Sequence, residues 1–151
     1  MNNKKQGFTL IELLVVIAII GLLSTLSILA LNQARARARD AKRVADVKQI
    51  QTALEMYYND AGDYPVTASI TPGLAISYGG NVYLAAIPNA PEPIDGSACT
   101  LNTAKAYTYT KTGSGQGGTA SYTINYCLGA NVNTITGNTL QTASPAGMRL
   151  P

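Results

Sequence analysis

The feature that most constrains this chain is an uncharged segment of 22 residues, 13–34, whose first part up to residue 31 is almost wholly apolar. A helix rises 1.5 Å per residue, so a helix over residues 13–31 is about 28 Å long, close to the roughly 30 Å hydrocarbon core of a bilayer. A secretory signal has a shorter apolar core of about 7 to 15 residues, with a cleavage site behind it. The sequence therefore predicts a membrane-spanning helix.

The next segment, residues 32–60, has the pattern of an amphipathic helix, because apolar residues such as Val44, Val47 and Ile50 recur at steps of three and four. No Pro precedes Pro65, so nothing forces a break between the two segments. One helix over residues 8–58 would be about 77 Å long. A small domain cannot bury that length, so part of the helix must lie in another environment. A run of turn-forming residues with Gly62 as a candidate cap predicts its end at residues 59–65.

The C-terminal part of the chain differs from the helical part in charge and composition. Of the 19 charged residues, 14 lie at or before Asp63, and the later residues are mostly Gly, Pro, Thr, Ser, Asn and Tyr. Residues 106–110 and 121–126 alternate with period two around the Gly-rich residues 113–118, which predicts a hairpin with one aromatic face. A further short strand or helix is expected within residues 74–87. The predicted fold is α+β, with a long N-terminal helix packed on a small antiparallel sheet in a head over residues 61–151.

Composition argues against an enzyme. The chain has no His, and its net charge is +3. Without His there is no Ser-His-Asp or Cys-His machinery and no His-containing zinc site. Two carboxylates, Glu92 and Asp95, could ligate Ca²⁺, but they are thin evidence for a site because Ca²⁺ takes six to eight oxygens, and the sequence leaves calcium binding open. The sequence thus predicts no catalytic residues, no metal and no cofactor, and its weak charge gives no reason to expect nucleic acid as the main partner.

Residues 4–12 read Lys-Lys-Gln-Gly-Phe-Thr-Leu-Ile-Glu and lead into the apolar segment with Gly21 inside it. This order of a basic leader, Gly, Phe, an acid four residues on and a long apolar helix resembles the N-terminal signature of type IV pilins and type II secretion pseudopilins. Residues 57–65 are similar to the helix end of many pseudopilins, and beyond Pro65 only the layout is similar. The family commonly has a Pro in the second half of the apolar helix, where this chain has Leu29 and no Pro.

The resemblance implies that residues 1–7 are a leader, cut between Gly7 and Phe8 by a membrane-embedded prepilin peptidase, and that the new Phe8 amine is then methylated. Gly7 has no Cβ, so its backbone can lie extended against a catalytic pair of carboxylates. Lys4 and Lys5 can hold the leader at the anionic cytoplasmic surface, at about 1 kcal/mol each. The alternative is that Gly7 is simply a flexible residue before an anchor helix.

Glu12 is an acid at the start of the apolar helix, where a carboxylate deep in the bilayer costs about 2.5 to 3.5 kcal/mol. We expect its partner to be the Phe8 amine of a neighbouring subunit, because four residues give a rise of about 6 Å and a one-turn shift brings the two together. The alternative is that Glu12 lies near the headgroups with no role. Gly21 and Thr25 form a small-x-x-x-small pair that predicts close helix packing, unless they merely dilute a hydrophobic anchor.

Cys99 and Cys127, the only cysteines, flank the predicted hairpin. Outside the cytoplasm a disulfide is the default, and on the chain-entropy model it would contribute about 3.5 kcal/mol. Two reduced, buried thiols are the alternative.

A basic run at residues 35–43 is interpreted as a solvated face or as a site of pairing between subunits, and Asp40 and Asp46 can each pair with Arg43 three residues away. The positive-inside rule alone would place the C-terminal part in the cytoplasm. The leader, which must face a cytoplasmic peptidase, and the two cysteines favour export instead.

The function implied is that of a structural subunit: a single-pass precursor in the cytoplasmic (inner) membrane, assembled by an inner-membrane platform into a homo-oligomeric pilus or pseudopilus outside it. Residues 8–31 would then form the filament core and residues 32–60 the amphipathic half of the same helix. Two alternatives are a minor tip pilin that binds DNA or a surface, and a monomeric membrane-anchored domain. Glu12 argues against the anchored domain and against the subunit at the very tip. The sequence does not name the filament's task among motility, adhesion, DNA uptake and secretion.

Overall fold

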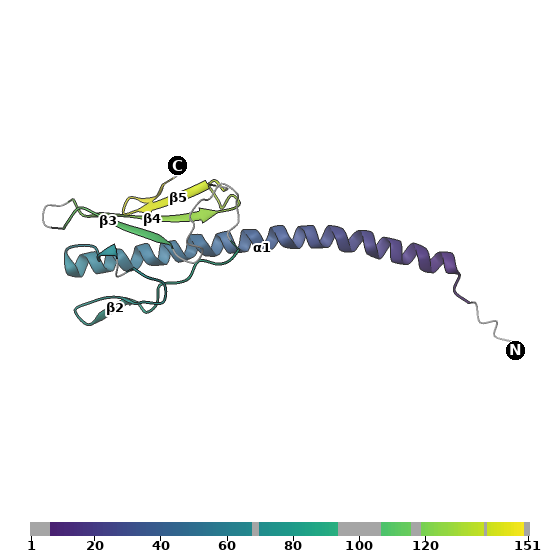
Figure 1. Ribbon diagram of the computed structural model, residues 1–151, viewed down its shortest axis with the longest axis horizontal. Helices are drawn as coiled ribbons and strands as arrows, with labels where there is room; N and C mark the ends of the chain where they lie inside the picture. Colours follow the sequence, from purple (N-terminus) through teal and green to yellow (C-terminus); the bar gives the residue numbers. More distant parts are fainter. Residues whose placement is uncertain (1–6, 68–69, 94–106, 116–118, 138, 150–151) are drawn as a thin grey trace. The chain divides into compact units, whose positions relative to one another are not determined.

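The computed structural model describes residues 7–67, 70–93, 107–115, 119–137 and 139–149 (Figure 1). Within these ranges the chain forms one helix, α1 (Leu10–Ala61), and the strands β1 (Ile76–Tyr78), β2 (Asn81–Leu84), β3 (Thr108–Thr112), β4 (Ser121–Leu128), β5 (Thr139–Ser144) and β6 (Gly147–Arg149). Strands β1 and β2 make a two-stranded sheet, and the other four make a second sheet in the order β3-β4-β5-β6. All pairs are antiparallel, which confirms the predicted α+β class.

The chain divides into two compact units, Met1–Arg35 and Ala36–Pro151. The first contains the apolar part of α1. The second, which we call the head, contains the rest of α1 and both sheets. Each unit is described by itself.

Helix α1 ends where the turn-forming residues predicted. Gly62 has a φ of 71°, a left-handed conformation that favours glycine, and its N–H donates to the carbonyl oxygen of Tyr58 at 2.8 Å. This bond is the αL cap motif, which satisfies one of the last carbonyls of a helix. The predicted helix over residues 8–58 is confirmed, with a start two residues later and an end three residues later.

The core of the head lies between one face of α1 and the inner face of the larger sheet. The apolar positions that recur along α1, among them Val47, Ile50 and Leu54, are at most 1% exposed, as their periodicity predicted. Strand β4 alternates against them and places Tyr122, Ile124 and Tyr126 on the buried side. Figure 1 shows β3, β4 and β5 beside this part of the helix.

The predicted hairpin is confirmed as β3 and β4, which pair with Tyr109 opposite Ile124. Its aromatic face is present, because the rings of Tyr109 and Tyr122 stack with centroids 5.9 Å apart. Residues 74–87 hold β1 and β2. Strands β5 and β6 were not predicted, because β5 (Thr-Leu-Gln-Thr-Ala-Ser) buries only Gln141 and Ala143 on its inner face and so shows no apolar alternation.

A buried ion pair joins α1 to two loops. Asp40 and Arg43 pair with each other and are 0% and 2% exposed. The carboxylate of Asp40 also accepts hydrogen bonds from the backbone N–H groups of Gly129 at 3.1 Å and Ala130 at 2.7 Å. Arg43 donates to the carbonyl oxygens of Pro91 and Pro93, each at 2.7 Å. The predicted pairing of Arg43 with Asp40 is confirmed.

One part of the prediction for this basic run is wrong. Arg43 does not belong to a solvated face, because it is 2% exposed and donates to the loop carbonyls. Asp46 accepts a hydrogen bond from the Tyr107 hydroxyl at 2.8 Å, and its pairing with Arg43 stays a prediction.

Two further carboxylates of α1 accept tyrosine hydroxyls. Glu55 accepts from Tyr64 at 3.1 Å and from Tyr122 at 3.2 Å. Asp60, at the end of the helix, accepts from the hydroxyl of Tyr83. Acids along one helix thus bind several separate segments of the head.

Asp40→Ala should destabilise the head strongly. The change leaves the Arg43 guanidinium buried without its carboxylate, and losing one partner of a buried pair costs about 3 to 5 kcal/mol. We expect a loss of about 3 kcal/mol in the free energy of unfolding, measured by urea denaturation of the full chain in detergent. The exposed Lys48→Ala serves as control and should stay within about 0.5 kcal/mol of the parent. A loss below about 1 kcal/mol in Asp40→Ala would show that the pair is not needed.

Alkaline pH should unfold the head through its buried tyrosines. Burial raises the pKa of Tyr107 and Tyr122, helped by the nearby Asp46 and Glu55, and burial raises the pKa of Tyr126 to about 12. A raised folded-state pKa favours the protonated phenol, so this stability is complete below about pH 10, the unfolded value, and declines as pH rises through the raised values. Phenolate absorbance and circular dichroism should therefore change together above about pH 10. Complete ionisation near the ordinary pKa with the fold intact would contradict this.

Candidate functional site

The junction between Gly7 and Phe8 lies just before α1, in a segment without regular secondary structure, and both residues are exposed. The Phe8 side chain is 75% exposed. A Cβ added at Gly7 would meet nothing within 4 Å, and its φ is not in the left-handed region. The fold itself therefore gives no reason for glycine at position 7. A requirement for glycine must come from another molecule that approaches this backbone.

Glu12 has a local partner that the sequence reasoning missed. Its Oε2 accepts hydrogen bonds from the backbone N–H of Thr9, at 2.8 Å, and from the Thr9 hydroxyl. In return the Glu12 N–H points to the Thr9 hydroxyl oxygen, at 3.3 Å. This reciprocal arrangement is a capping box, and its signature of Thr, two residues and Glu before an apolar run is readable in the sequence. The capping box sets the start of α1 immediately after Phe8.

The capping box occupies one of the two carboxylate oxygens of Glu12. Both bonds reach Oε2, so Oε1 has no hydrogen-bond partner among the residues that the structure describes. Local donors already satisfy half of the carboxylate, which reduces the cost of placing it in apolar surroundings. The other oxygen stays available to a donor from outside. Pairing of Glu12 with the Phe8 amine of a neighbouring subunit stays a prediction.

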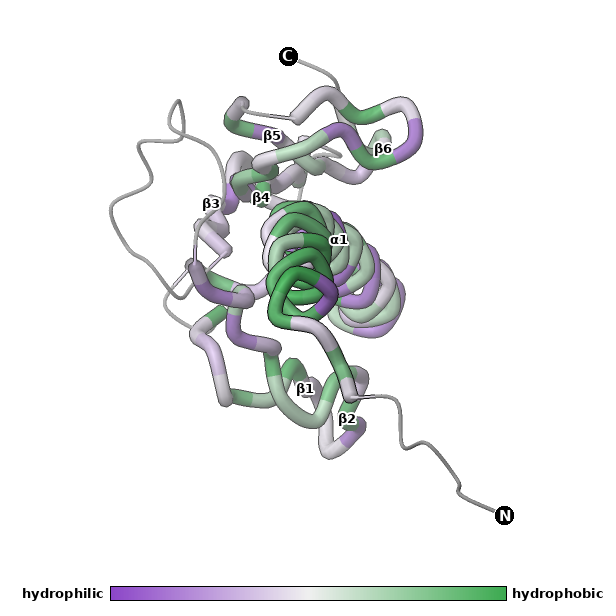
Figure 2. The backbone as a smooth tube through the Cα atoms, turned by 90° about the vertical axis from the view of Figure 1, so that its right-hand side faces the viewer, coloured by the Kyte–Doolittle hydropathy of each residue, from purple (hydrophilic) through white to green (hydrophobic). Residues whose placement is uncertain are grey.

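The unit that contains these residues has an apolar surface all round. Its large side chains are between 43% and 81% exposed: Phe8, Leu10, Ile11, Leu13, Leu14, Val15, Val16, Ile17, Ile19, Ile20, Leu22, Leu23, Leu26, Ile28, Leu29 and Leu31. Figure 2 shows the apolar part of α1 in green. The helix is long and apolar enough to cross a membrane. A surface of this kind needs lipid or other protein around it, because soluble monomers rarely expose large apolar patches.

The hydroxyl side chains in the apolar part of α1 are hydrogen-bonded within the helix. Ser24 donates to the carbonyl of Ile20 at 2.7 Å, and Thr25 and Ser27 donate to carbonyls of the preceding turn at 2.8 Å. Such bonds let hydroxyls lie in apolar surroundings without a partner from another helix. A Cβ added at Gly21 would meet nothing within 4 Å, so its missing side chain leaves space only for something outside the chain. Close helix packing at Gly21 and Thr25 stays a prediction.

The two cysteines are not both described. Cys127 is 7% exposed and lies inside β4, which extends two residues beyond the predicted strand. Cys99 and Asp95 lie outside the described residues, so the disulfide stays a prediction. Glu92 is exposed. Within the described ranges, no group of three or more His, Cys, Asp or Glu side chains could hold a metal ion.

The N-terminal region matches a known family. Residues 2–28 match the prokaryotic N-terminal methylation motif. The chain is 35% identical over 99 residues to the type II secretion system core protein G of Escherichia coli strain K12, which covers 60% of this chain and 68% of that protein. It is 32% identical over 111 residues to the type IV major pilin protein PilA of Myxococcus xanthus, covering 67% of this chain and 50% of PilA.

A fimbrial protein of Neisseria meningitidis serogroup B is 37% identical over 65 residues, which cover 43% of this chain and 38% of that protein. Four further core protein G relatives are matched over only 41% to 46% of their length. No solved structure matches the chain. The methylation motif, the capping box before an exposed apolar helix and the extended match to core protein G lead to one conclusion: the chain belongs to the family of type IV pilins and type II secretion pseudopilins.

Proposed function

We propose that this chain is a structural subunit that polymerises into a type IV pilus or pseudopilus after cleavage between Gly7 and Phe8. The observation that carries the proposal is the apolar part of α1, which lies behind a processing motif and buries none of its spanning window within the chain. Lipid can cover this surface first, and parallel copies of the same helix can cover it later. The names of the relatives, which include secretion proteins, a fimbrial protein and a pilin, support the same function.

The precursor is a single-pass protein of the cytoplasmic membrane, with its leader on the cytoplasmic side and its head on the other. A prepilin peptidase removes residues 1–7 and methylates the Phe8 amine, and an assembly platform in the inner membrane moves the subunit into an extracellular or periplasmic filament. The exposed Gly7–Phe8 junction, which lies outside the helix, supports the first step. In the head, a disulfide between Cys99 and Cys127 suits export.

In this proposal Glu12 has two partners in succession. Thr9 holds Oε2 while the subunit lies in the membrane. The Phe8 amine of an adjacent subunit, shifted by one helical turn of about 6 Å, then binds the remaining oxygen and sets the register of assembly. The capping box stays in the mature chain, because cleavage at Gly7–Phe8 leaves the Thr9 amide intact.

The processed protein should begin at Phe8 and carry one added methyl group, which intact-mass measurement can check. Replacing Gly7 with Leu should leave uncleaved precursor in the membrane, because the new side chain obstructs the peptidase while the fold has open space for it. Gly21→Ala is the matched control, since that glycine also has open space around it and lies away from the junction. Normal processing of Gly7→Leu would contradict the proposal.

Three variants at the capping box separate the charge of Glu12 from its capping role. Glu12→Val should insert normally and be processed, but filament assembly should fail, because an unpaired buried amine costs about 3 to 5 kcal/mol at each interface. Glu12→Gln keeps an oxygen that can accept from Thr9 and should also fail. Thr9→Val removes the hydroxyl part of the capping box, keeps the charge of Glu12 and should still assemble. The measurement compares processed subunit in the membrane with filament sheared from cells. Normal filaments from Glu12→Gln would show that the charge does not set the register.

A further inference from the structure

The C-terminal end of α1 lacks the positive charge that usually stabilises such an end. A helix carries about half a negative elementary charge at its C-terminus, and basic residues there are favourable. The last turn of α1 has no basic residue and contains Asp60 instead. Lys111 lies in the same unit but is paired with Asp63 at 2.7 Å. Among the described residues, no cation is paired with Asp60, and its Oδ1 has no hydrogen-bond partner.

A cluster of three aromatic rings adjoins this negative charge through Tyr83. Tyr57 makes edge contacts with Tyr78 and Tyr83, with ring centroids 5.4 and 6.2 Å apart, and Tyr83 donates its hydroxyl to Asp60. Tyr78 is 45% exposed. The faces of aromatic rings attract Lys and Arg side chains, and a nearby carboxylate adds to that attraction. We call Asp60 with these three tyrosines the acidic end, and its chemistry fits an incoming basic side chain.

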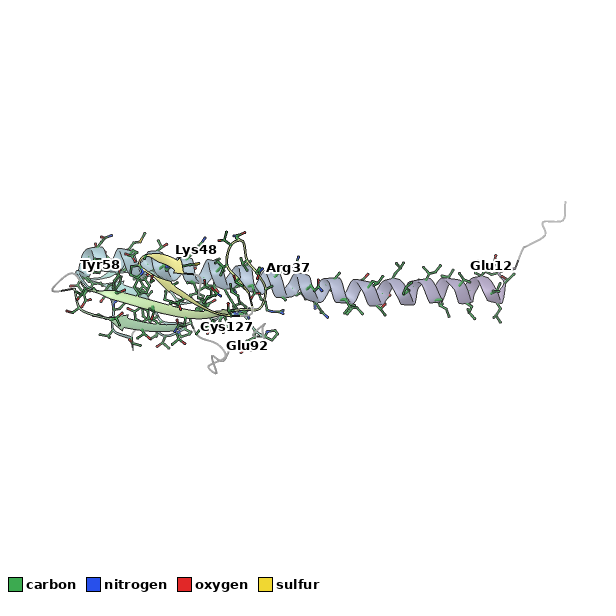
Figure 3. All side chains as sticks on the ribbon, turned by 90° about the horizontal axis from the view of Figure 1, so that it is seen from above. Glu12, Arg37, Lys48, Tyr58, Glu92 and Cys127 are labelled. Atoms are coloured by element: carbon green, nitrogen blue, oxygen red, sulfur yellow. The ribbon has the colours of Figure 1, made fainter. Side chains whose placement is uncertain are left out.

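The same helix carries exposed basic side chains that make no ion pair with the residues that the structure describes. Arg37, Lys42 and Lys48 are exposed, and we call them the basic band. In the part of the chain that the structure describes, the carboxylates in ion pairs are bound to Arg43 and Lys111, and none binds a residue of this band. Figure 3 shows Arg37 and Lys48 along α1, and Tyr58 near its C-terminal end.

We propose that in the filament the basic band of one copy binds the acidic end of another copy. This inference rests on the proposed function and names a contact between heads within it. Lys48 is about 18 Å and Arg37 about 35 Å from Asp60 along the helix axis, so a band cannot reach the acidic end of its own chain. Parallel copies displaced by about 18 to 35 Å along that axis bring the two surfaces together. This displacement is about three to six of the one-turn shifts that separate adjacent subunits, so the contact joins copies that are not adjacent.

The partner that binds the acidic end is a second copy of this chain, because both complementary surfaces lie on one chain. Two such surfaces favour a head-to-tail contact. A contact between two different patches repeats without closing on itself and produces open helical polymers, whereas a contact of one patch with itself produces closed dimers. A filament needs the first kind. Successive copies enter the filament by the same step, so a contact between two different patches can repeat along it.

The first test is zero-length carbodiimide cross-linking of wild-type filaments, followed by mass spectrometry. The reagent joins a Lys amine directly to a carboxylate in contact with it, so Asp60 should be joined to Lys42 or Lys48. The separation within one chain forbids this product internally, and filaments mixed from light and heavy isotope-labelled subunits should show it between copies. The pair Lys111–Asp63, in contact within one head, is the internal control. Filaments that yield the control cross-link without the Asp60 cross-link would overturn the inference.

The second test is a charge exchange. Asp60→Lys and Lys48→Asp should each lower the amount of sheared filament about fivefold or more, because attraction becomes repulsion at every repeat of the contact. The double variant restores opposite charges and should regain most of the lost filament. Glu92→Lys, which reverses an exposed acid elsewhere on the head, is the matched control and should assemble normally.

The outcomes separate this inference from the function on which it rests. A double variant that assembles no better than either single variant would overturn the contact. Variants of the basic band that assemble normally and lose only binding of the subunit to anionic lipid would also overturn it. A wild-type chain that forms no filament would overturn the proposed function and this inference with it. Wild-type filaments without the cross-link and without rescue would overturn this inference alone.

Discussion

Everything in this protein depends on a helix whose two parts need different surroundings. From Leu10 onward α1 exposes apolar side chains on every side, and beyond Arg35 it buries one face against a sheet. No Pro interrupts the helix, so the backbone satisfies its own hydrogen bonds throughout, as a lipid-exposed segment requires. The first part can only be covered by molecules other than this chain. Residence in a membrane and packing against other copies in a filament are two ways to meet that requirement.

Acids on α1 organise the head. Asp40, Asp46 and Glu55 bind the loop after β4, the residue before β3 and the start of β4, through backbone N–H groups or tyrosine hydroxyls. Bonds from one rigid helix to several segments fix the position of each segment relative to the others. A small head with few charges thereby gains directional contacts in addition to its apolar core. Buried polar groups that are satisfied in this way favour one arrangement of the core over others.

Glu12 and Asp60 show how one carboxylate can bind groups within its own subunit and still accept a donor from another subunit. Each uses one carboxylate oxygen for a local bond, to Thr9 or to Tyr83 and Asn81, and keeps the other without a partner among the described residues. The local bond holds the side chain in place, which lowers the entropy lost when a partner arrives. One acid lies near each end of α1, so a repeating polymer could use both.

The sequence by itself determined the features that depend on neighbours along the chain. The apolar span, the amphipathic period, the glycine cap at Gly62 and the β3–β4 hairpin follow from spacing within a few residues, and the processing motif is a local string. The Thr9–Glu12 capping box belongs with them, since its signature was present in the sequence although we missed it. Tertiary structure decided the rest. Asp46 meets Tyr107 across 61 positions and Asp40 meets Gly129 across 89, and the loop at Pro91 buries Arg43. No local pattern encodes which of several acids meets which donor, because that choice depends on how the sheet and loops fold back onto the helix.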